Sequence, residues 1–371
     1  MKTMKYEDAL NFILQKQSLG IKPGLERILK LLEKMGNPHS SLKVIHIAGT
    51  NGKGTVAKTI NDTLIEKGCK VGLFTSPWVT DYREQIQINN KMISKGSFAE
   101  YIKVYKENDC SEFEFLTAIM YKYFADEKVD YAVVECGMGG KGDATNVEKK
   151  NLAVITSISL DHTDFLGNTI EEIACEKTGI IKENSTCILS PNKECEHIFE
   201  KVCREKNVKL VKVCKDGNFI SDNLNTAAAA IYELGFNTAV NLSHLPARHE
   251  VIGMNVLLDG GHNVAAAKAL VQNPLFEDDI AVAVIGMMKD KDVGGYLSVV
   301  APKCRKIIAA TPSNPRSMPA DELAKIAKKY CNDVMVIDNP IDAVNVAEKS
   351  KKLFLVCGSF YLAREVRKEL F

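Results

Sequence analysis

The sequence has almost no excess of charge of either sign, with 48 Lys and Arg residues against 47 Asp and Glu residues among 371. This balance gives no reason to expect nucleic acid or an anionic membrane as the main partner. No apolar run reaches the roughly 18 residues of a membrane-spanning helix. Residues 1–10 also lack the apolar stretch of a secretory signal. We therefore expect a cytoplasmic protein.

Paired cysteines at metal-binding spacing are also missing. The chain has 11 cysteines, an odd number, and none of them forms a Cys-x-x-Cys pair, which excludes the usual structural zinc sites. Several cysteines, such as Cys136 and Cys357, lie in apolar runs typical of buried strands. We expect reduced, buried thiols in a reducing compartment.

What the sequence does contain is an alternation of short apolar runs with amphipathic helical stretches. A length of 371 residues with 46% apolar and 26% charged residues is typical of a soluble globular protein with two domains. The strand–helix rhythm predicts an α/β fold with a mostly parallel sheet covered on both faces. The strands expected in the first half span residues 43–48, 71–74, 131–135 and 153–157, and the first helix spans 53–67.

The same rhythm restarts near Val256 and predicts a second, smaller α/β domain. Its expected strands span residues 255–258, 280–285, 306–309, 334–337 and 353–357, with helices between them. The polar stretch 241–248, which contains Pro246, separates the helix expected at 222–234 from this second set. We place the domain boundary there, which gives domains at residues 1–245 and 246–371.

A glycine-rich segment follows the first strand and opens the first helix. It reads His46-Ile-Ala-Gly-Thr-Asn-Gly-Lys-Gly-Thr55. Backbone N–H groups in such a loop point at one anion, and the helix N-terminus adds positive potential. Lys53 would neutralise phosphates and Thr55 would offer a hydroxyl to Mg²⁺. The strict Walker spacing is not met, because Ile47 replaces a glycine and Gly54 is inserted, so a glycine-rich turn without ligand stays an alternative.

Three further polar residues follow strands of the first domain. Glu135 closes a strand, His162 comes shortly after the next one, and Lys177 ends a helix expected at 169–177. Ligands of open parallel sheets bind beyond the carboxyl ends of the strands, and a carboxylate there suits magnesium. Each residue also has a plainer interpretation, namely a helix cap, a buried histidine or a surface lysine.

Short motifs follow one another in a fixed order along nearly the whole chain. They are Gly20-Ile-Lys-Pro-Gly-Leu-Glu-Arg27, Gly49-Thr-Asn-Gly-Lys-Gly-Thr55, Thr75-Ser-Pro77, Phe113-Glu-Phe-Leu-Thr-Ala118, Glu135-Cys-Gly-Met-Gly-Gly140, Asp143-Ala-Thr-Asn146, Ile155-Thr-Ser-Ile-Ser-Leu-Asp-His162, Glu176-Lys-Thr-Gly-Ile180, Leu258-Asp-Gly-Gly-His-Asn263, Lys289-Asp-Lys-Asp292 and Gly358-Ser-Phe-Tyr361. In these motifs the chain resembles the folylpolyglutamate synthase/dihydrofolate synthase family of the Mur ligase superfamily.

The resemblance implies a fold and an activity. It implies an N-terminal P-loop, Mur ligase-like domain that binds ATP and a pterin acid, and a smaller C-terminal domain that binds glutamate. The implied enzyme is a monomeric ligase that uses ATP and Mg²⁺, with two metal ions. It would add L-glutamate to dihydropteroate or folate through an acyl phosphate, as part of folate and one-carbon metabolism.

The resemblance also implies roles for particular residues. The implied catalytic residues are Lys53, His162, Lys177 and Arg248, with Lys177 carried as a carbamate. The implied ATP contacts are Asn51, Gly52, Lys53, Gly54, Thr55, Asn225, Arg248, Asp259 and His262. The implied magnesium residues are Thr55, Ser76, Glu135, His162 and Lys177. The implied substrate contacts are Gly24, Leu25, Glu26, Phe113, Glu114, Gly142, Asp143 and Ala144.

The chain departs from the family pattern at several positions. Trp78 stands where the family usually has His, Lys141-Gly142 replaces Arg-Leu, and Ser221-Asp222 replaces a His-Gln pair before Asn225. These departures leave two alternatives open. One is another amide ligase of the Mur superfamily, and the other is a P-loop nucleotide-binding protein without ligase activity.

Overall fold

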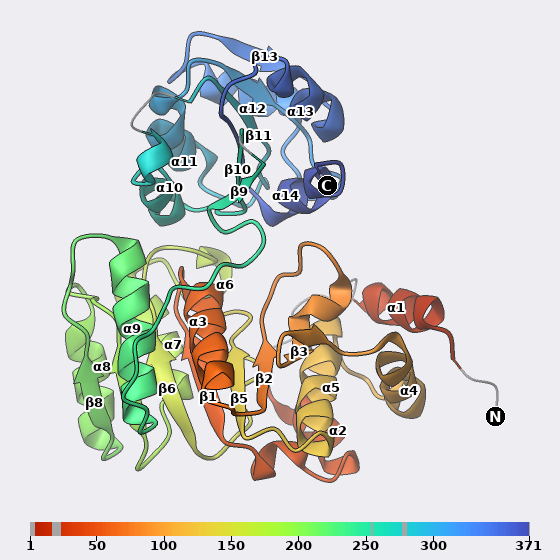
Figure 1. Cartoon of the computed structure of the whole chain (residues 1–371), viewed down its shortest axis with the longest axis vertical. Coiled ribbons are helices and arrows are strands. Elements are labelled where there is room, and N and C mark those ends of the chain that lie inside the picture. Colours follow the sequence, from red (N-terminus) through yellow and green to blue (C-terminus); the bar gives the residue numbers. More distant parts are fainter. Residues whose placement is uncertain (1–3, 17–23, 254, 277–279, 371) are drawn as a thin grey trace. The chain divides into compact units, whose positions relative to one another are not determined.

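The computed structural model describes residues 4–16, 24–253, 255–276 and 280–370. Part of the first motif, residues 20–23, therefore lies outside the described residues. The chain separates into two compact units (Figure 1). Unit 1 comprises Met1–Pro77, Arg83–Ile158 and Asp164–Ser243, and unit 2 comprises Trp78–Tyr82, Ser159–Thr163 and His244–Phe371.

Unit 1 is built on an eight-stranded sheet in the order β4-β3-β2-β5-β1-β6-β7-β8. Strands β2, β5, β1, β6, β7 and β8 pair in parallel, and β3 and β4 add an antiparallel edge. The bounds are β1 Val44–Ala48, β2 Val71–Phe74, β3 Ile86–Ile88, β4 Lys91–Met92, β5 Tyr131–Glu135, β6 Asn151–Ile155, β7 Thr186–Leu189 and β8 Lys209–Lys212. The mostly parallel sheet predicted from the sequence is confirmed.

Helices cover both faces of this sheet, as the nearly continuous apolar character of its strands requires. On one face, α3 and α9 bury side chains such as Ile60 and Ala230 against Ile45 and Ile47 of β1. The opposite face carries α5, α7 and α8 (Figure 1). The helices are α1 Tyr6–Gln15, α2 Glu26–Lys34, η2 Pro38–Ser41, α3 Lys53–Glu66, η3 Tyr82–Gln85, α4 Lys95–Tyr105, α5 Glu112–Asp126, α6 Thr163–Leu166, α7 Ile170–Lys177, η4 Thr178–Ile180, α8 Glu196–Glu205 and α9 Phe219–Glu233.

Unit 2 has a six-stranded sheet in the order β13-β12-β11-β14-β10-β9, parallel except for β9. Its strands are β9 Glu250–Ile252, β10 Val256–Asp259, β11 Val282–Ile285, β12 Ile307–Ala309, β13 Val334–Val336 and β14 Phe354–Cys357. Its helices are α10 Val264–Leu270, η5 Pro274–Phe276, α11 Val293–Val300, η6 Ala301–Lys303, α12 Ala320–Ala327, α13 Pro340–Glu348 and α14 Phe360–Arg367. It is the second α/β layer structure that the restarted rhythm predicts.

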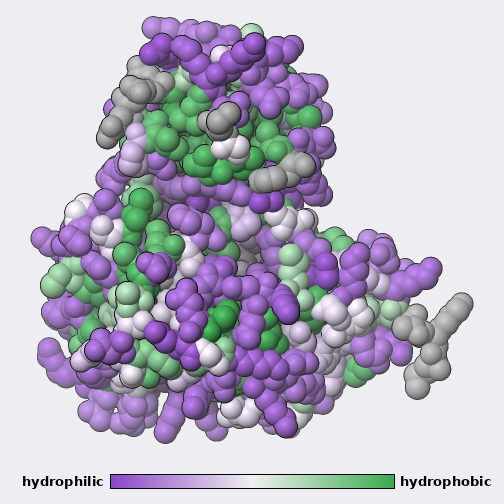
Figure 2. Space-filling model, viewed as in Figure 1, coloured by the Kyte–Doolittle hydropathy of each residue, from purple (hydrophilic) through white to green (hydrophobic). Residues whose placement is uncertain are grey.

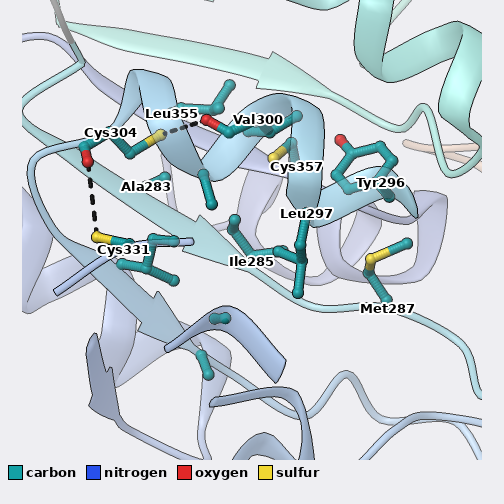
Figure 3. Packing of buried hydrophobic residues seen from close by; sticks show 14 of the residues in the cluster. Ala283, Ile285, Met287, Tyr296, Leu297, Val300, Cys304, Cys331, Leu355 and Cys357 are labelled. Atoms are coloured by element: carbon teal, nitrogen blue, oxygen red, sulfur yellow. Dashed lines mark hydrogen bonds between the residues drawn. The ribbon is translucent and has the colours of Figure 1, made fainter. Parts of the chain in front are cut away.

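The core of unit 2 shows how its cysteines are used. Between the sheet and helices α10, α11 and α12, Cys304, Cys331 and Cys357 pack among aliphatic side chains and Tyr296 (Figure 3). The Cys304 thiol lies 3.4 Å from the carbonyl of Val300, and the Cys331 thiol lies 3.6 Å from the carbonyl of Cys304. All eleven cysteines of the chain are free thiols, and most are buried. They behave as small apolar side chains, as expected.

Most predicted strands differ from the observed strands by one or two residues at an end, and two of these differences have a clear cause. Strand β6 ends at Ile155 rather than at residue 157, because the carbonyl of Ser157 turns to accept a hydrogen bond from the N–H of Thr50 at 2.7 Å. Strand β11 begins at Val282 rather than at residue 280, since Ile280 makes only an isolated bridge to Cys304. Strands β3, β4, β7, β8 and β9 were not predicted. They are short, and β8 has lysines at both ends.

Hydrophilic residues dominate the visible surface, and hydrophobic residues reach it in places (Figure 2). The large apolar side chains exposed among the described residues include Leu160, Phe165, Tyr232, Val251 and Val336. In the described part of the chain, every helix is too short or too polar to span a membrane.

Candidate functional site

The phosphate loop is shaped by its contact with the end of β6. At position 49 the backbone has φ 153°, and a Cβ there would lie 1.8 Å from the hydroxyl oxygen of Thr156, so only glycine fits. The N–H of Thr50 donates to the carbonyl of Ser157 at 2.7 Å, and the Ser157 hydroxyl donates to the carbonyl of Asn51 at 3.2 Å. These two hydrogen bonds fix the start of the phosphate loop through contacts within the protein.

Helix α3 begins directly after this loop. Gly52 precedes it with φ 84°, and the helix runs for 14 residues from Lys53. Its first N–H groups and its dipole favour an anion at this end. The Lys53 ammonium donates to the carbonyl of Thr50 at 3.1 Å, which folds the lysine back over the loop. Lys53 and Thr55 are only partly buried, so both can reach a bound phosphate.

A buried carboxylate lies at the neighbouring strand ends. Glu135 ends β5, which stands between β1 and β2 in the sheet, and its residue surface is 2% exposed. One of its oxygens accepts a hydrogen bond from the N–H of Ser76 at 3.0 Å. Ser76, Glu135 and the phosphate loop thus meet at the carboxyl edge of the sheet, where parallel sheets bind ligands.

Lys177 is buried beneath the phosphate loop, where its residue surface is 3% exposed. Its ammonium donates to the carbonyl of Gly49 at 2.8 Å. Helix α7, which carries Lys177, starts with a complete capping box formed by Thr169 and Glu172, and such a box fixes the start of a helix. Lys177 therefore lies next to the phosphate loop, although its sequence context also suited a surface lysine.

The same helix end also supports the glycine-rich loop after β5. The N–H of Lys141 donates to the carbonyl of Glu176 at 2.8 Å. A Cβ on Gly140 would lie 2.8 Å from that carbonyl oxygen and 2.9 Å from the Cα of Lys177. This backbone approach explains the glycine at 140, and it places the loop 136–146 against the lysine.

The predicted substrate residues are only partly brought together. Phe113 packs on the backbone of Gly137, where a Cβ would lie 2.6 Å from the ring, and its ring centroid is 5.8 Å from that of Phe74. The Glu114 carboxylate accepts a hydrogen bond from the N–H of Ser111 at 2.8 Å, in a capping box at the start of α5. It also binds Arg27 at 3.1 Å. The Glu114 carboxylate therefore already joins α5 to α2.

Gly24 and Leu25 precede helix α2, which begins with Glu26. Gly24 has φ 102°, a conformation that favours glycine. Asp143, predicted to contact substrate, is 6% exposed. Its two oxygens accept hydrogen bonds from the N–H groups of Thr145 and Met138 at 2.9 and 2.7 Å, so this carboxylate organises its own loop.

Unit 2 gathers several of the predicted residues around Asp161. This carboxylate accepts from the Lys291 ammonium at 2.7 Å and from the Asn263 amide at 2.9 Å, and it lies 3.3 Å from Nε2 of His262. Nε2 of His162 is 4.0 Å away. Burial alone would raise the pKa of Asp161, but His262, at 3.3 Å, and the other nearby positive charges hold it well below its usual value.

The ligand atoms of Asp161, His162 and His262 lie within 4.8 Å of one another, close enough to hold a metal ion. Since Lys291 and Asn263 already bind the carboxylate, we interpret the group as an ion-pair cluster. Sequence reasoning missed Asp161 and Lys291 as site residues. Their presence in the motifs that contain His162 and Lys289 was the available signal.

Arg248 and Asp259 have defined surroundings in the same unit. The Arg248 guanidinium stacks on the ring of Phe360 at 3.8 Å, an arrangement that keeps its charge and fixes its plane. Asp259 is buried and accepts from the N–H groups of His249 and Gly261 at 3.0 and 2.8 Å. Glu250, which lies two positions after Arg248 in the sequence, is bound by Arg367 at 2.8 Å.

The predicted adenine contact, Asn225, lies near the start of α9. Its amide is 3.4 Å from a carboxylate oxygen of Asp216, and the N–H of Asp216 donates to Asp222 at 3.0 Å. Asn223, which was not predicted, is the residue of α9 that faces the phosphate loop. A Cβ on Gly52 would lie 2.4 Å from its side-chain oxygen.

Comparison with known proteins assigns the chain to a family. The Mur ligase middle domain model matches residues 47–271, and the Mur ligase glutamate ligase domain model matches residues 247–360. The probable dihydrofolate synthetase of Schizosaccharomyces pombe is 31% identical and aligns with 94% of this chain and 99% of its own length. The chain belongs to the dihydrofolate synthase/folylpolyglutamate synthase family of Mur ligases.

Solved structures of this family have the same fold. Escherichia coli FolC in complex with DHPP and ADP is 26% identical, with a TM-score of 0.87 over 99% of this chain and 97% of that one. A bifunctional folylpolyglutamate synthase/dihydrofolate synthase with Mn, AMPPNP and L-glutamate bound is 26% identical, with a TM-score of 0.86 over the full length of both chains. The predicted family and the predicted fold class are confirmed.

Proposed function

We propose that this member of the family is an ATP-dependent ligase that joins L-glutamate to the carboxylate of a pteroate- or folate-type acid. The observation that carries the proposal is the phosphate loop, held by β6 and set beside buried Glu135 and Lys177. The E. coli relative is described with DHPP and ADP, and the bifunctional relative with AMPPNP, Mn and L-glutamate. These ligand classes are the ones that we carry over to this chain.

The oxygen donors near the phosphate loop fit a magnesium ion. A buried carboxylate on Glu135 and hydroxyls on Ser76 and Thr55 are hard ligands of the type that Mg²⁺ takes beside a phosphate loop. We propose two ions, with His162 and Lys177 completing the set. Bound magnesium would screen the negative charges that must approach one another.

Lys177 would serve the second ion as a carbamate. A carbamate forms when the neutral amine attacks CO₂ and loses a proton, which turns the cation into an anionic oxygen ligand. The amine of Lys177 lies at the carbonyl of Gly49, at the base of the phosphate loop, so a carbamate there would add negative charge beside the phosphates that the ions bind.

The proposed reaction has two steps. A carboxylate oxygen of the acid attacks the γ-phosphorus of ATP, the bond to the β,γ-bridging oxygen breaks, and ADP leaves, which gives an acyl phosphate. The glutamate amine then attacks the acyl carbon, phosphate leaves with the electrons of the C–O bond, and the nitrogen loses a proton to a base. Lys53 would stabilise the charge on the transferred phosphoryl group in the first step.

The remaining residues divide between nucleotide and acid. Residues Asn51 to Gly54 would hold the triphosphate together with Asn225, and Arg248, Asp259 and His262 would contribute from unit 2. The acid would meet residues 24–26, 113–114 and 142–144. We further propose that residues 1–245 bind ATP and the acid, and that residues 246–371 bind glutamate.

The enzyme would act on small molecules, as a monomer in the cytoplasm and without nucleic acid or membrane partners. The eleven free thiols support a reducing compartment. Within the family, dihydropteroate and folate are both candidate acids.

A glutamate-dependent assay of ADP release tests the proposal. With ATP, Mg²⁺ and either dihydropteroate or folate, turnover should require both glutamate and the acid, and the new amide should appear in equal amount. A UDP-sugar peptide should not replace the acid. If it did, the result would favour another Mur ligase activity. ADP release that is independent of glutamate would point instead to a nucleotide-binding protein without ligase activity.

A further inference from the structure

His46 is a titratable residue inside an otherwise apolar strand. It lies in β1, three residues before the phosphate loop, and its side chain is completely buried. Ile45 and Ile47 face α3 and α9, so the alternation of the strand turns His46 to the opposite face. On that face it meets residues from the stretch 136–148 that follows β5.

The imidazole is held on both sides. Nδ1 lies 2.6 Å from a carboxylate oxygen of Glu148, and Nε2 lies 2.8 Å from the hydroxyl oxygen of Thr145. The Thr145 hydroxyl in turn donates to Asp143 at 2.5 Å. The other oxygen of Asp143 accepts from the N–H of Met138. A continuous row of contacts thus runs from the phosphate-loop strand to the backbone of the loop 136–146.

The contacts in this row favour an imidazolium. The single proton of the Thr145 hydroxyl is used on Asp143, so Nε2 must supply the proton between itself and Thr145. Nδ1 lies at ion-pair distance from the Glu148 carboxylate, and a ring that carries a proton on both nitrogens is positively charged. In a neutral ring accepting from the Cys136 thiol, which is 3.1 Å away, Nε2 and the Thr145 oxygen would face each other without a proton.

The electrostatic surroundings agree with this count. Burial by itself would lower the pKa of His46, but Cys136 and Glu148 raise it well above its usual value. Burial would likewise raise the pKa of Glu148, whereas His46 lowers it. Tyr121 of α5 also contacts the pair. Its hydroxyl donates to the carbonyl of Thr145 at 2.7 Å and lies 3.2 Å from Glu148.

We propose that His46 is a positioning residue that, as an imidazolium paired with Glu148, fixes the loop 136–146 through Thr145 and Asp143. This loop carries residues 142–144, which are proposed to meet the acid, so the inference rests on the proposed function. Loss of these contacts should therefore affect binding of the acid and leave binding of ATP unchanged. The row of contacts ends in the acid-binding loop, whereas the phosphate loop is held separately by Thr156 and Ser157.

Replacing Thr145 breaks this row at its middle with little change in shape. Thr145→Val keeps the volume but leaves Nε2 and Asp143 without their shared partner, and Thr145→Ser keeps the hydroxyl. The Val variant should raise KM for the pteroate-type acid by about tenfold, the size expected for a lost charge-assisted hydrogen bond. KM for ATP should change by less than about twofold, and the Ser variant should restore the acid KM.

Two measurements on the same proteins do not depend on activity. Nitrogen NMR of histidine-labelled wild-type protein at about pH 8 should show both ring nitrogens of His46 protonated, well above the ordinary histidine pKa of about 6.5. Hydrogen exchange of the Met138 amide, which donates to Asp143, should be at least about tenfold faster in Thr145→Val than in Thr145→Ser.

The outcomes separate the two proposals. Absence of glutamate-dependent turnover in the wild-type enzyme would remove the proposed function, while the NMR and exchange results would still judge the positioning role. A neutral His46, an unchanged exchange rate, or an equal rise in KM for ATP and for the acid would each overturn the positioning role.

Discussion

The two glycine-rich loops of unit 1 use their polar residues in opposite ways. In residues 49–55, Lys53 and Thr55 are only partly buried. In residues 136–146, Asp143, Thr145 and Asn146 are buried and bonded within the protein. The first loop leaves these two polar side chains partly exposed, whereas the second uses its polar side chains to hold a shape. A motif of glycines and polar residues therefore does not say by itself which of its side chains act on substrate.

The largest effect on activity should come from a change in the phosphate loop, residues 49–55. Lys53→Ala should lower the ligation rate by two to three decades, because a preorganised charge on the transferred phosphoryl group is worth about 3–4 kcal/mol. The measurement is glutamate-dependent ADP release at saturating ATP. Lys58→Ala, on the same helix but paired with Asp62, is the matched control and should keep normal turnover. A normal rate in Lys53→Ala would disprove the phosphate-loop assignment.

Lys177 contacts both the phosphate loop and the loop 136–146. Its removal tests whether the two loops serve the same reaction. Lys177→Ala should lose about two decades of activity, the upper range for a residue that supports a metal site. Formate or acetate should restore part of this loss by replacing the carbamate. The exposed Lys201 of α8 gives a control variant that should be normal. Mass spectrometry of the intact, metal-loaded enzyme that finds no added CO₂ would contradict the carbamate.

Arg248 extends the comparison to unit 2. If it binds phosphate mainly in the transition state, Arg248→Ala should lower kcat by one to two decades and leave nucleotide affinity nearly unchanged. Arg248→Lys should recover only part, because a point charge cannot copy the planar fork. Single-turnover phosphorylation and ATP binding are the measurements.

Arg367 provides the control for Arg248, since it binds Glu250 within the same unit. Arg367→Ala should lower the thermal midpoint with normal chemistry. The same pattern in Arg248→Ala, with lower stability and unchanged chemistry, would place Arg248 among the structural residues.

The smallest effect concerns the pH dependence of stability that the His46–Glu148 pair gives beside the loop 136–146. The raised pKa of His46 gives stability that is complete below about pH 6.5 and is lost as pH rises through the folded-state pKa. The lowered pKa of Glu148 gives stability that is complete above about pH 4.3 and is lost at lower pH. Glu148→Gln should therefore cost most between these values and about 1 kcal/mol less near pH 8.

The midpoint of urea unfolding, followed by circular dichroism in both proteins at each pH, measures this difference. The other ionisable groups near the pair include His39, Cys136, Tyr121, Asp143 and Lys182, and they are common to both proteins. Glu127→Gln removes an exposed partner of Lys70 and should give a difference that does not vary with pH. A constant cost for Glu148→Gln from about pH 5 to about pH 8 would refute the charged pair.

The sequence was most informative where local pattern decides the structure. The strands at 71–74 and 131–135 and the start of α3 are as predicted, because apolar runs and a glycine-rich turn determine them locally. The limit of β6 was wrong because it depends on a hydrogen bond from Thr50, which lies more than a hundred residues earlier. The burial of Lys177 could be expected only from the family resemblance.

Side-chain pairs distant in sequence were out of reach for the same reason. Lys291 binds Asp161 across 130 positions, and neither residue has a local signal that names its partner. Asp143 is predicted to contact substrate, and the structure adds that both of its oxygens accept hydrogen bonds within its own loop. A carboxylate beside a glycine-rich turn has the same appearance in a sequence whether it faces a ligand or the backbone.

Unit 2 is assembled from three separate stretches of chain. Trp78 stacks under Arg364 at 3.4 Å and Asp161 binds Lys291, although Trp78 and Asp161 precede the main stretch, which starts at His244. During synthesis, Trp78 and Asp161 leave the ribosome long before the residues that they contact. A fragment that begins at residue 244 would contain Arg364 and Lys291 without these partners, so cutting the gene at the polar linker would not yield a complete second unit.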